Sequence, residues 1–270
     1  MIEKTTFKRA KKPLIFANWK MHFTSKEAEK TTLEILKLLA KEKINPREIE
    51  IVLTPSFTAL KGVAQLIKGT GLKLGAQDCF WEEKGSFTGE VSPFDLKELG
   101  VEYVIIGHSE RRENLGETDG MIHKKIKAAF KANLVPLLCV GETFDERQKG
   151  IKDYKIMNQI TRAFEGIKIK NGDKLIIAYE PVWVIGSGQA VAPEEAHYVN
   201  QVIKQRMIDL IGPALAEETT SFIYGGSVDE NNIKNFMQCG IDGILCEAGV
   251  LVGGASLKAE QFVRLIKSVV

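Results

Sequence analysis

The sequence predicts an α/β fold in which a single domain forms a (β/α)8 barrel. Short apolar runs alternate with longer amphipathic stretches from one end of the chain to the other, as in parallel strands joined by helices. Eight such units follow one another, and eight strands close a barrel. No linker rich in Pro, Gly or Ser divides the 270 residues, and barrels of this length fold as one domain.

Each expected strand is a short apolar run that suits a parallel sheet covered on both faces. The first seven strands are expected at 14–17, 50–53, 72–75, 101–106, 135–140, 175–179 and 222–224. The eighth strand is expected within 243–252.

Each expected helix is a longer stretch with apolar residues at helical spacing. Ser25 is expected to cap the first helix, which runs to about residue 42. Pro193 suits the first position of a helix that runs to residue 210. The other helices are expected near 58–67, 118–132, 154–164, 231–239 and 256–269.

The overall charge gives no reason to expect a polyanionic partner. Lys and Arg total 37, Asp and Glu total 35, and the net charge is +2, so neither nucleic acid nor a membrane surface is expected. No apolar run approaches the roughly 20 residues that span a bilayer. Residues 1–12 are basic and have no apolar core of a secretory signal, so we expect a flexible tail ahead of one barrel domain at 13–270.

The four cysteines are Cys79, Cys139, Cys239 and Cys246. No two of them have CxxC spacing, which argues against a zinc site and against a thioredoxin-like motif. A disulfide framework is not expected in a chain of this length. We therefore expect buried or weakly reactive thiols and a cytoplasmic protein.

Polar residues that are able to do chemistry follow several of the expected strands. They are Asn18 and Lys20 after the first strand, His108 and Glu110 after the fourth, and Glu180 at the end of the sixth. A barrel brings these strand ends to one mouth, where its active site lies. Alone, each residue is more often a cap, a core residue or a solvated side chain; their shared position indicates an active site.

Glycine-rich turns after the last two strands predict a site for an anion. Gly225-Gly226-Ser227 follows the seventh strand and Gly253-Gly254 follows the eighth, while Gly186 and Gly188 lie in an expected lid after Glu180. Main-chain N–H groups without side chains beside them approach a phosphate closely, and barrels commonly bind phosphate at these two loops.

The rest of a phosphorylated substrate would face three side chains at the same mouth. Lys20 offsets negative charge, His108 donates a hydrogen bond to a carbonyl oxygen as an enediolate forms, and Glu180 removes a proton from the neighbouring carbon. Glu110 lies near enough in the chain to assist Lys20 and His108, and Arg111 and Arg112 favour a structural salt-bridge network.

The chain resembles the triosephosphate isomerase family from about residue 14 to residue 265. The resemblance rests on Asn18-Trp19-Lys20-Met21, Ile106-Gly107-His108-Ser109-Glu110-Arg111-Arg112, Cys139-Val140-Gly141-Glu142-Thr143, Tyr179-Glu180-Pro181-Val182-Trp183, Tyr224-Gly225-Gly226-Ser227-Val228 and Leu251-Val252-Gly253-Gly254-Ala255-Ser256-Leu257. Together these motifs are highly specific. The family is itself the standard example of a Glu base beside a neutral His under a closing loop, so those roles come with the resemblance.

The resemblance implies a TIM barrel that interconverts dihydroxyacetone phosphate and glyceraldehyde 3-phosphate, without cofactor or metal, in glycolysis and gluconeogenesis. It implies that Asn18 and Lys20 contact the substrate, that His108 is the electrophile, Glu180 the base and Glu110 a helper. It implies that Gly186, Ser227, Gly253 and Gly254 form the phosphate site, under a lid at 181–193.

The resemblance also implies a homodimer. The expected gap between the third and fourth strands, 76–99, contains a long loop. Its 85–90 segment resembles the one that inserts Thr88 into a partner subunit in this family.

The chain departs from the family before the eighth strand. The family has one residue between Asp-Gly and Leu-Val-Gly-Gly, whereas here 244–250 separates Asp242-Gly243 from Leu251-Val252. Either a longer loop precedes a strand at about 249–252, or the strand is at 243–246 and the phosphate loop is longer. We favour the first because it keeps Gly253 at the mouth.

Two other functions suit the same barrel. One is a different phosphosugar isomerase or epimerase that holds a metal ion. The histidines argue against this function, because no two of the four share a strand end. The other is a barrel that binds phosphosugars without catalysis because the extra residues distort the site. The presence of every candidate catalytic residue argues against it.

Overall fold

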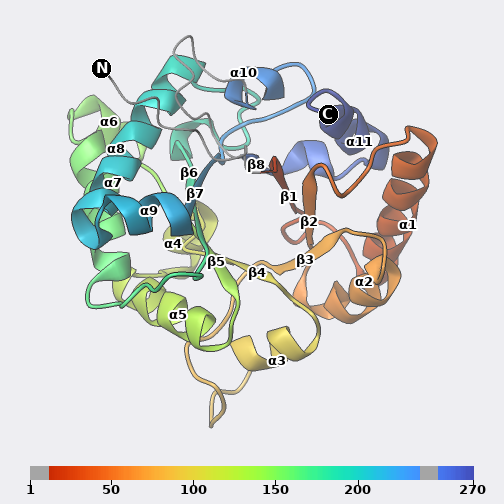
Figure 1. The fold of residues 1–270 in the computed structure, drawn as a ribbon, viewed down its shortest axis with the longest axis horizontal. Helices are drawn as coiled ribbons and strands as arrows, with labels where there is room; N and C mark the ends of the chain where they lie inside the picture. Colours follow the sequence, from red (N-terminus) through yellow and green to blue (C-terminus); the bar gives the residue numbers. More distant parts are fainter. Residues whose placement is uncertain (1–11, 238–248) are drawn as a thin grey trace, which may run out of the picture.

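The structure is a computed structural model that describes residues 12–237 and 249–270. Eight parallel strands form a closed barrel in chain order, and helices surround it, as predicted (Figure 1). The last strand pairs with the first, with Gly249 opposite Leu14, and this pairing closes the ring. The strands are β1 Leu14–Asn18, β2 Glu50–Thr54, β3 Lys73–Ala76, β4 Tyr103–Ile106, β5 Val135–Val140, β6 Leu175–Tyr179, β7 Thr220–Tyr224 and β8 Gly249–Val252.

The position of β8 decides between the two alternatives left by the sequence. A strand at Gly249–Val252 ends directly before Gly253, so the first alternative is confirmed. The segment 243–246 lies outside the described residues, as do 1–11 of the expected tail. Among the other strands, β4 begins at Tyr103, two residues later than predicted, and β7 begins at Thr220, two residues earlier.

The longer helices lie where the amphipathic pattern predicted them, and α10 lies within the stretch predicted at 231–239, but the other short helices α3, α4, α6 and α9 were missed. The helices are α1 Ser25–Lys41, η1 Phe57–Ala59, α2 Leu60–Ile67, α3 Pro93–Glu98, α4 Ser109–Leu115, α5 Asp119–Lys131, α6 Phe144–Gln148, α7 Lys152–Phe164, η2 Val182–Val184, α8 Pro193–Ile211, α9 Pro213–Thr219, α10 Ile233–Met237, η3 Gly254–Ser256 and α11 Ala259–Lys267. The end of the helix predicted at 231–239 lies outside the described residues.

The prediction that Ser25 caps α1 was wrong, because Thr24 does so. The Thr24 hydroxyl accepts a hydrogen bond from the Glu27 main-chain N at 3.3 Å, and the Glu27 carboxylate accepts one from the Thr24 main-chain N at 2.9 Å. This reciprocal pair satisfies two N–H groups that the helix leaves open. Ser25 instead donates its hydroxyl to the main-chain oxygen of Thr58.

Side chains that alternate along the strands build two apolar layers. Those that point into the barrel, such as Phe16 of β1, Leu137 of β5 and Leu251 of β8, form an inner core. Their neighbours along each strand, such as Ile15 and Val250, pack under the helices in a larger outer core. The strands are therefore covered on both faces, as a parallel barrel requires.

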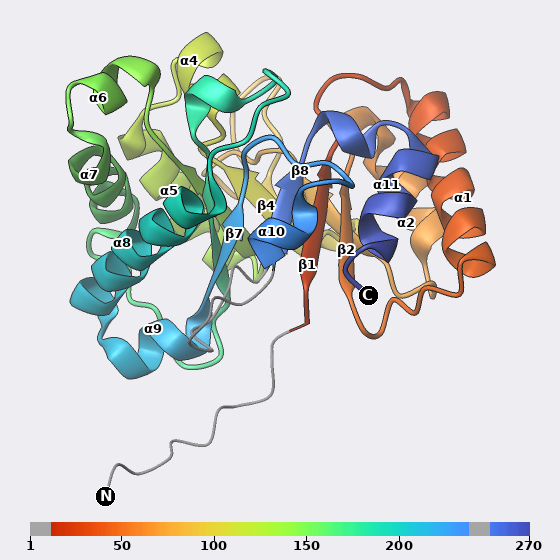
Figure 2. The same ribbon diagram turned by 90° about the horizontal axis from the view of Figure 1, so that it is seen from above.

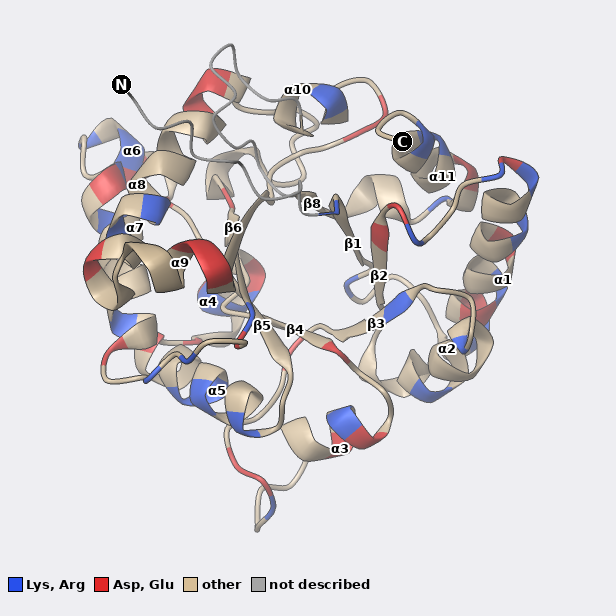
Figure 3. Cartoon of the chain, viewed as in Figure 1, with Lys and Arg blue, Asp and Glu red and all other residues tan. Residues whose placement is uncertain are grey.

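Charged residues lie mostly on the helices and loops outside the barrel, with both signs intermixed (Figure 3). In the part of the chain that the structure describes, no helix combines the length and apolar character needed to cross a membrane.

The short helices α4 and α6 lie at the same end of the barrel, the end at which the strands finish (Figure 2).

The loop between β3 and α3 projects from the body of the barrel (Figure 1). Its base is fixed by a hydrogen bond from the Phe80 main-chain N to the Val91 main-chain O at 2.8 Å, and the Phe80 ring stacks on Trp81 and packs on Phe87. Phe87 is 43% exposed and Thr88 is exposed. The loop is thus a folded projection with Phe87 and Thr88 exposed at its tip.

Candidate active site

The end of β1 presents Asn18 and Lys20 to the mouth of the barrel. Lys20 has a φ of +50°, a left-handed conformation that costs a non-glycine residue about 1–3 kcal/mol. The Lys20 main-chain N donates to Asn18 Oδ1 at 3.1 Å, and Gln77 Nε2 donates to the Lys20 main-chain O at 2.8 Å and to the Thr54 main-chain O at 2.9 Å. Gln77, which the sequence reasoning missed, therefore holds the strained turn that aims Lys20.

The Lys20 ammonium forms an ion pair with Glu110, with 2.5 Å between Nζ and Oε1. Its side chain also passes Gly253, where an added Cβ would lie 3.5 Å from Lys20 Cε. Lys20 thus connects the first helix turn after β4 with the loop after β8.

His108 caps α4, and this contact decides which ring nitrogen carries the proton. Its Nδ1 accepts a hydrogen bond from the Glu110 main-chain N at 3.2 Å. A nitrogen that accepts carries no proton, so a neutral ring has its proton on Nε2. Nε2 lies 3.2 Å from Glu180 Oε1, so the donor side of the ring and the carboxylate meet.

Glu180 follows β6 directly and is 1% exposed. Its Oε2 accepts a hydrogen bond from the Ser109 main-chain N at 3.0 Å. Its Oε1 is buried and makes no well-aligned hydrogen bond with any described residue, the ring of His108 included. A buried polar atom without a hydrogen bond calls for an explanation. A role as the oxygen that accepts a proton during the reaction would explain it.

Glycines directly after both neighbouring strands, β5 and β7, make room for Glu180. A Cβ on Gly141 would lie 1.7 Å from the main-chain O of Glu180, and one on Gly225 would lie 2.8 Å from its Cγ. Cys139 also lies beside this glutamate; burial, and then the nearby carboxylate, raise the pKa of its thiol well above the ordinary value. Cys139 therefore stays protonated. The pKa of the other described cysteine, Cys79, is also raised, mainly by burial.

The segment 181–193, the expected lid, is held at both ends by groups that the sequence reasoning did not single out. At its start, the buried Glu142 carboxylate accepts hydrogen bonds from Trp183 Nε1 at 3.0 Å and from the Tyr179 hydroxyl at 3.2 Å. Burial raises the pKa of Glu142 above its ordinary range. At its far end, the Val191 main-chain N donates to the Tyr224 hydroxyl at 3.3 Å.

A cavity of about 310 Å³ lies at this mouth, under the lid. The predicted residues that line it are Asn18, Lys20, His108, Gly186, Gly188, Gly225, Gly226, Ser227, Gly253 and Gly254. Glu180 and Glu110 are not part of the wall but touch residues that are, His108 and Lys20. The structure thus gathers the predicted residues in one place.

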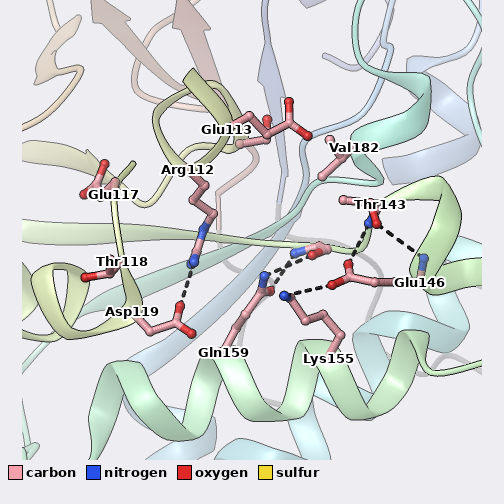
Figure 4. A pocket seen from close by; sticks show the side chains of 12 residues that line it. Arg112, Glu113, Glu117, Thr118, Asp119, Thr143, Glu146, Lys155, Gln159 and Val182 are labelled. Atoms are coloured by element: carbon pink, nitrogen blue, oxygen red, sulfur yellow. Dashed lines mark hydrogen bonds and ion pairs between the residues drawn. The ribbon is translucent and has the colours of Figure 1, made fainter. Parts of the chain in front are cut away.

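A second cavity, of about 360 Å³, lies beside the lid base and outside the barrel (Figure 4). Its charged side chains are mostly engaged with one another: Arg112 pairs with Asp119 at 2.6 Å and Lys155 with Glu146 at 2.8 Å. None of the candidate catalytic side chains lines it. We therefore assign the candidate active site to the smaller cavity.

Residues 111 and 112 have the structural role that the sequence favoured. Arg111 binds Asp78 and Glu117, at 2.8 and 2.6 Å, and Lys125 joins the same buried group of charges. Arg112 also donates to the main-chain O of Gly107. Within residues 12–237 and 249–270, no three or more His, Cys, Asp or Glu side chains are arranged to hold a metal ion.

The fold and this mouth define a (β/α)8-barrel enzyme with its site at the carboxyl ends of the strands. The family model described as triosephosphate isomerase matches residues 13–269. The chain therefore belongs to the triosephosphate isomerase family, and by that membership it is an isomerase.

Individual relatives agree with the family model. A triosephosphate isomerase from Caldanaerobacter subterraneus subsp. tengcongensis is 44% identical over 257 residues, which cover 95% of this chain and 99% of the relative. The enzymes of that name from Clostridium tetani and Dictyoglomus thermophilum are each 43% identical, over 95% and 96% of this chain and over 96% and 100% of their own lengths.

Proposed function

We propose that the chain interconverts dihydroxyacetone phosphate and D-glyceraldehyde 3-phosphate, a step of glycolysis and gluconeogenesis, in the cytoplasm and without cofactor or metal. The observation that carries the proposal is the pairing of Glu180 with His108. The buried Glu180 Oε1, which makes no well-aligned hydrogen bond with the described residues, lies 3.2 Å from His108 Nε2. One group accepts a proton and the other donates a hydrogen bond, as an aldose–ketose isomerisation requires.

The phosphate would bind at the glycine-rich end of the cavity. Gly186, Ser227, Gly253 and Gly254 all line that cavity and offer N–H or O–H donors. Lys20 adds positive charge beside Gly253, and Asn18 holds its turn. The carbon atoms of the substrate would then lie between the phosphate end and His108.

The proton transfer uses two side chains in turn. Glu180 removes a proton from the carbon beside the carbonyl, and His108 Nε2 donates to the carbonyl oxygen, so an enediolate forms. Glu180 returns the proton to the adjacent carbon. The proton of the original hydroxyl passes to the former carbonyl oxygen beside His108 Nε2, so that the carbonyl and the alcohol change places. Glu110 holds Lys20 in place through their ion pair, and the lid at 181–193 excludes water from the intermediate.

The first test is isomerisation of glyceraldehyde 3-phosphate by the purified chain, with and without EDTA. We expect rapid turnover that EDTA does not change, because the proposed chemistry needs only side chains. A folded chain that gives no turnover, or one whose turnover EDTA abolishes, would overturn the proposal.

We propose further that residues 13–270 form one domain and that the chain is a homodimer through the 85–90 loop. The projecting loop supports the dimer: its base is hydrogen-bonded and stacked, yet Phe87 and Thr88 at its tip are exposed. Met21, beside the catalytic Lys20, is 94% exposed and offers apolar surface to a partner.

Replacing Thr88 by arginine is expected to convert dimers into monomers and to lower turnover. Thr88 lies on the exposed tip, so a charged side chain there disturbs the interface rather than the fold. Sedimentation or light scattering at several concentrations measures the change. Tyr154→Arg is the control, because Tyr154 is 68% exposed on α7, on another part of the surface. Unchanged dimers with Thr88→Arg, or fully active monomers, would contradict this interface.

A further inference from the structure

An acidic side chain lies in the wall of the proposed phosphate site. Asp229 belongs to the loop after β7, two residues beyond Ser227, and it lines the same cavity. Among the described residues of that wall, it is the one acidic side chain and Lys20 is the one cationic side chain. Lys20 is already paired with Glu110, so no excess of positive charge faces a bound phosphate.

The position of the Asp229 carboxylate is fixed by the turn that leads into α10. Its Oδ1 accepts hydrogen bonds from the main-chain N atoms of Asn231, at 2.8 Å, and Asn232, at 3.2 Å. Its main-chain N donates to Asn232 Oδ1 at 2.9 Å. The side chain therefore cannot turn away from the loop without breaking this network.

The negative charge of Asp229 has no cationic partner in the part of the chain described here. Its Oδ1 contacts only neutral N–H groups, and Oδ2 makes no hydrogen bond or ion pair with these residues. The nearby cation Arg264 is bound to Glu230 at 2.8 Å instead. The charge consequently acts on whatever occupies the cavity.

We propose that Asp229 sets the affinity of this site for the phosphate group by repelling it. The inference rests on the proposed function, because it takes the glycine-rich end of the cavity to bind a phosphate ester. A carboxylate beside a dianion opposes binding, while the main-chain N–H groups favour it. Asp229 therefore keeps the substrate and product from binding too tightly, which speeds their release.

The charge of Asp229 can be removed without disturbing the turn, because the turn needs only an oxygen that accepts hydrogen bonds. Asp229→Asn keeps Oδ1 as an acceptor, and Asp229→Ser supplies another neutral acceptor that suits this position. Both variants should tighten binding of inorganic phosphate and of sulfate at low ionic strength, by about three- to tenfold, as expected for one charge removed near a dianion. Added salt should reduce that gain, because it screens the repulsion.

The measurement is an NMR titration of the full chain with inorganic phosphate, repeated with sulfate, at low and high salt. Glu34→Gln is the control, because it makes the same change of charge at an exposed position on α1; its affinity should equal that of the original chain. Equal affinities of the Asp229 variants and the original chain at low salt would overturn the inference. So would a gain that salt does not reduce, since that points to a change of shape rather than of charge.

This titration separates the inference from the proposed function. Tighter phosphate binding by both variants of a chain that does not isomerise triose phosphates would support the role of Asp229 and overturn the isomerase. Turnover of triose phosphates together with unchanged phosphate affinity of both variants would support the isomerase and overturn the role of Asp229.

Discussion

Replacing Glu180 by glutamine is expected to lower kcat by about a thousandfold, within the range that general bases contribute. The amide has nearly the same shape but accepts no proton from carbon. Glu180→Asp keeps the carboxylate but shortens the side chain by one methylene, away from its contacts with Ser109 and His108. Its kcat should therefore fall by about a hundredfold. Steady-state kinetics in both directions of the reaction measures both losses.

The melting temperatures of the Glu180 variants distinguish a loss of catalysis from a loss of folding. Glu180 is buried, and one of its oxygens lacks a hydrogen bond with the described residues. Neutralising such a group removes a desolvation penalty, so Glu180→Gln should melt at the same temperature as the original chain or higher. Glu113→Gln is the matched control: this exposed carboxylate lines the second cavity, and its loss should leave kcat unchanged. Near-normal turnover of Glu180→Gln would remove Glu180 from the mechanism.

Replacing His108 by glutamine is expected to lower kcat by about a hundredfold to a thousandfold, the usual effect of losing one donor to a developing oxyanion. The phosphate contacts remain, so KM should change much less than kcat. A variant that loses affinity but keeps its kcat would show that His108 binds substrate without acting on the transition state.

His108 has a second role as the cap of α4, and a paired variant isolates it. Asparagine at a helix N-cap accepts the hydrogen bond that Nδ1 now accepts from the Glu110 main-chain N. His108→Asn should therefore keep the melting temperature closer to that of the original chain than His108→Gln does, while both lose activity. If activity follows the melting temperature instead, the loss arises from the helix and not from the missing donor.

The barrel could be predicted from the sequence because its signals are local and repeated. Each strand is an apolar run, and each long helix has its own amphipathic face, so α1, α5 and α8 were expected close to their observed bounds. The eighth strand depended on one further argument, that Gly253 must end it. The short helices α3, α4, α6 and α9 escaped because five to seven residues are too few to establish a helical period.

The groups that support the site were harder to predict, because their partners are distant in the chain. Glu142 and Glu180 both follow a strand, β5 and β6, and look equivalent in the sequence. In the structure each keeps one buried oxygen without a hydrogen bond among the described residues. Glu142 Oε1 accepts hydrogen bonds from Trp183 and Tyr179, whereas Glu180 Oε1 lies 3.2 Å from His108 Nε2. Only three-dimensional neighbours separate the carboxylate that fastens the lid from the candidate base.

The pairing of β1 with β8 has a consequence for the order in which the protein is made. Asn18 and Lys20 lie on one side of this seam, and Gly253 and Gly254 lie on the other. On the ribosome, β1 emerges first and waits for its partner until Val252 has left the exit tunnel. During that time the growing chain has an unpaired strand edge at each side of an open sheet, where other chains can attach. The cavity that defines the candidate active site is therefore among the last parts of the molecule to assemble.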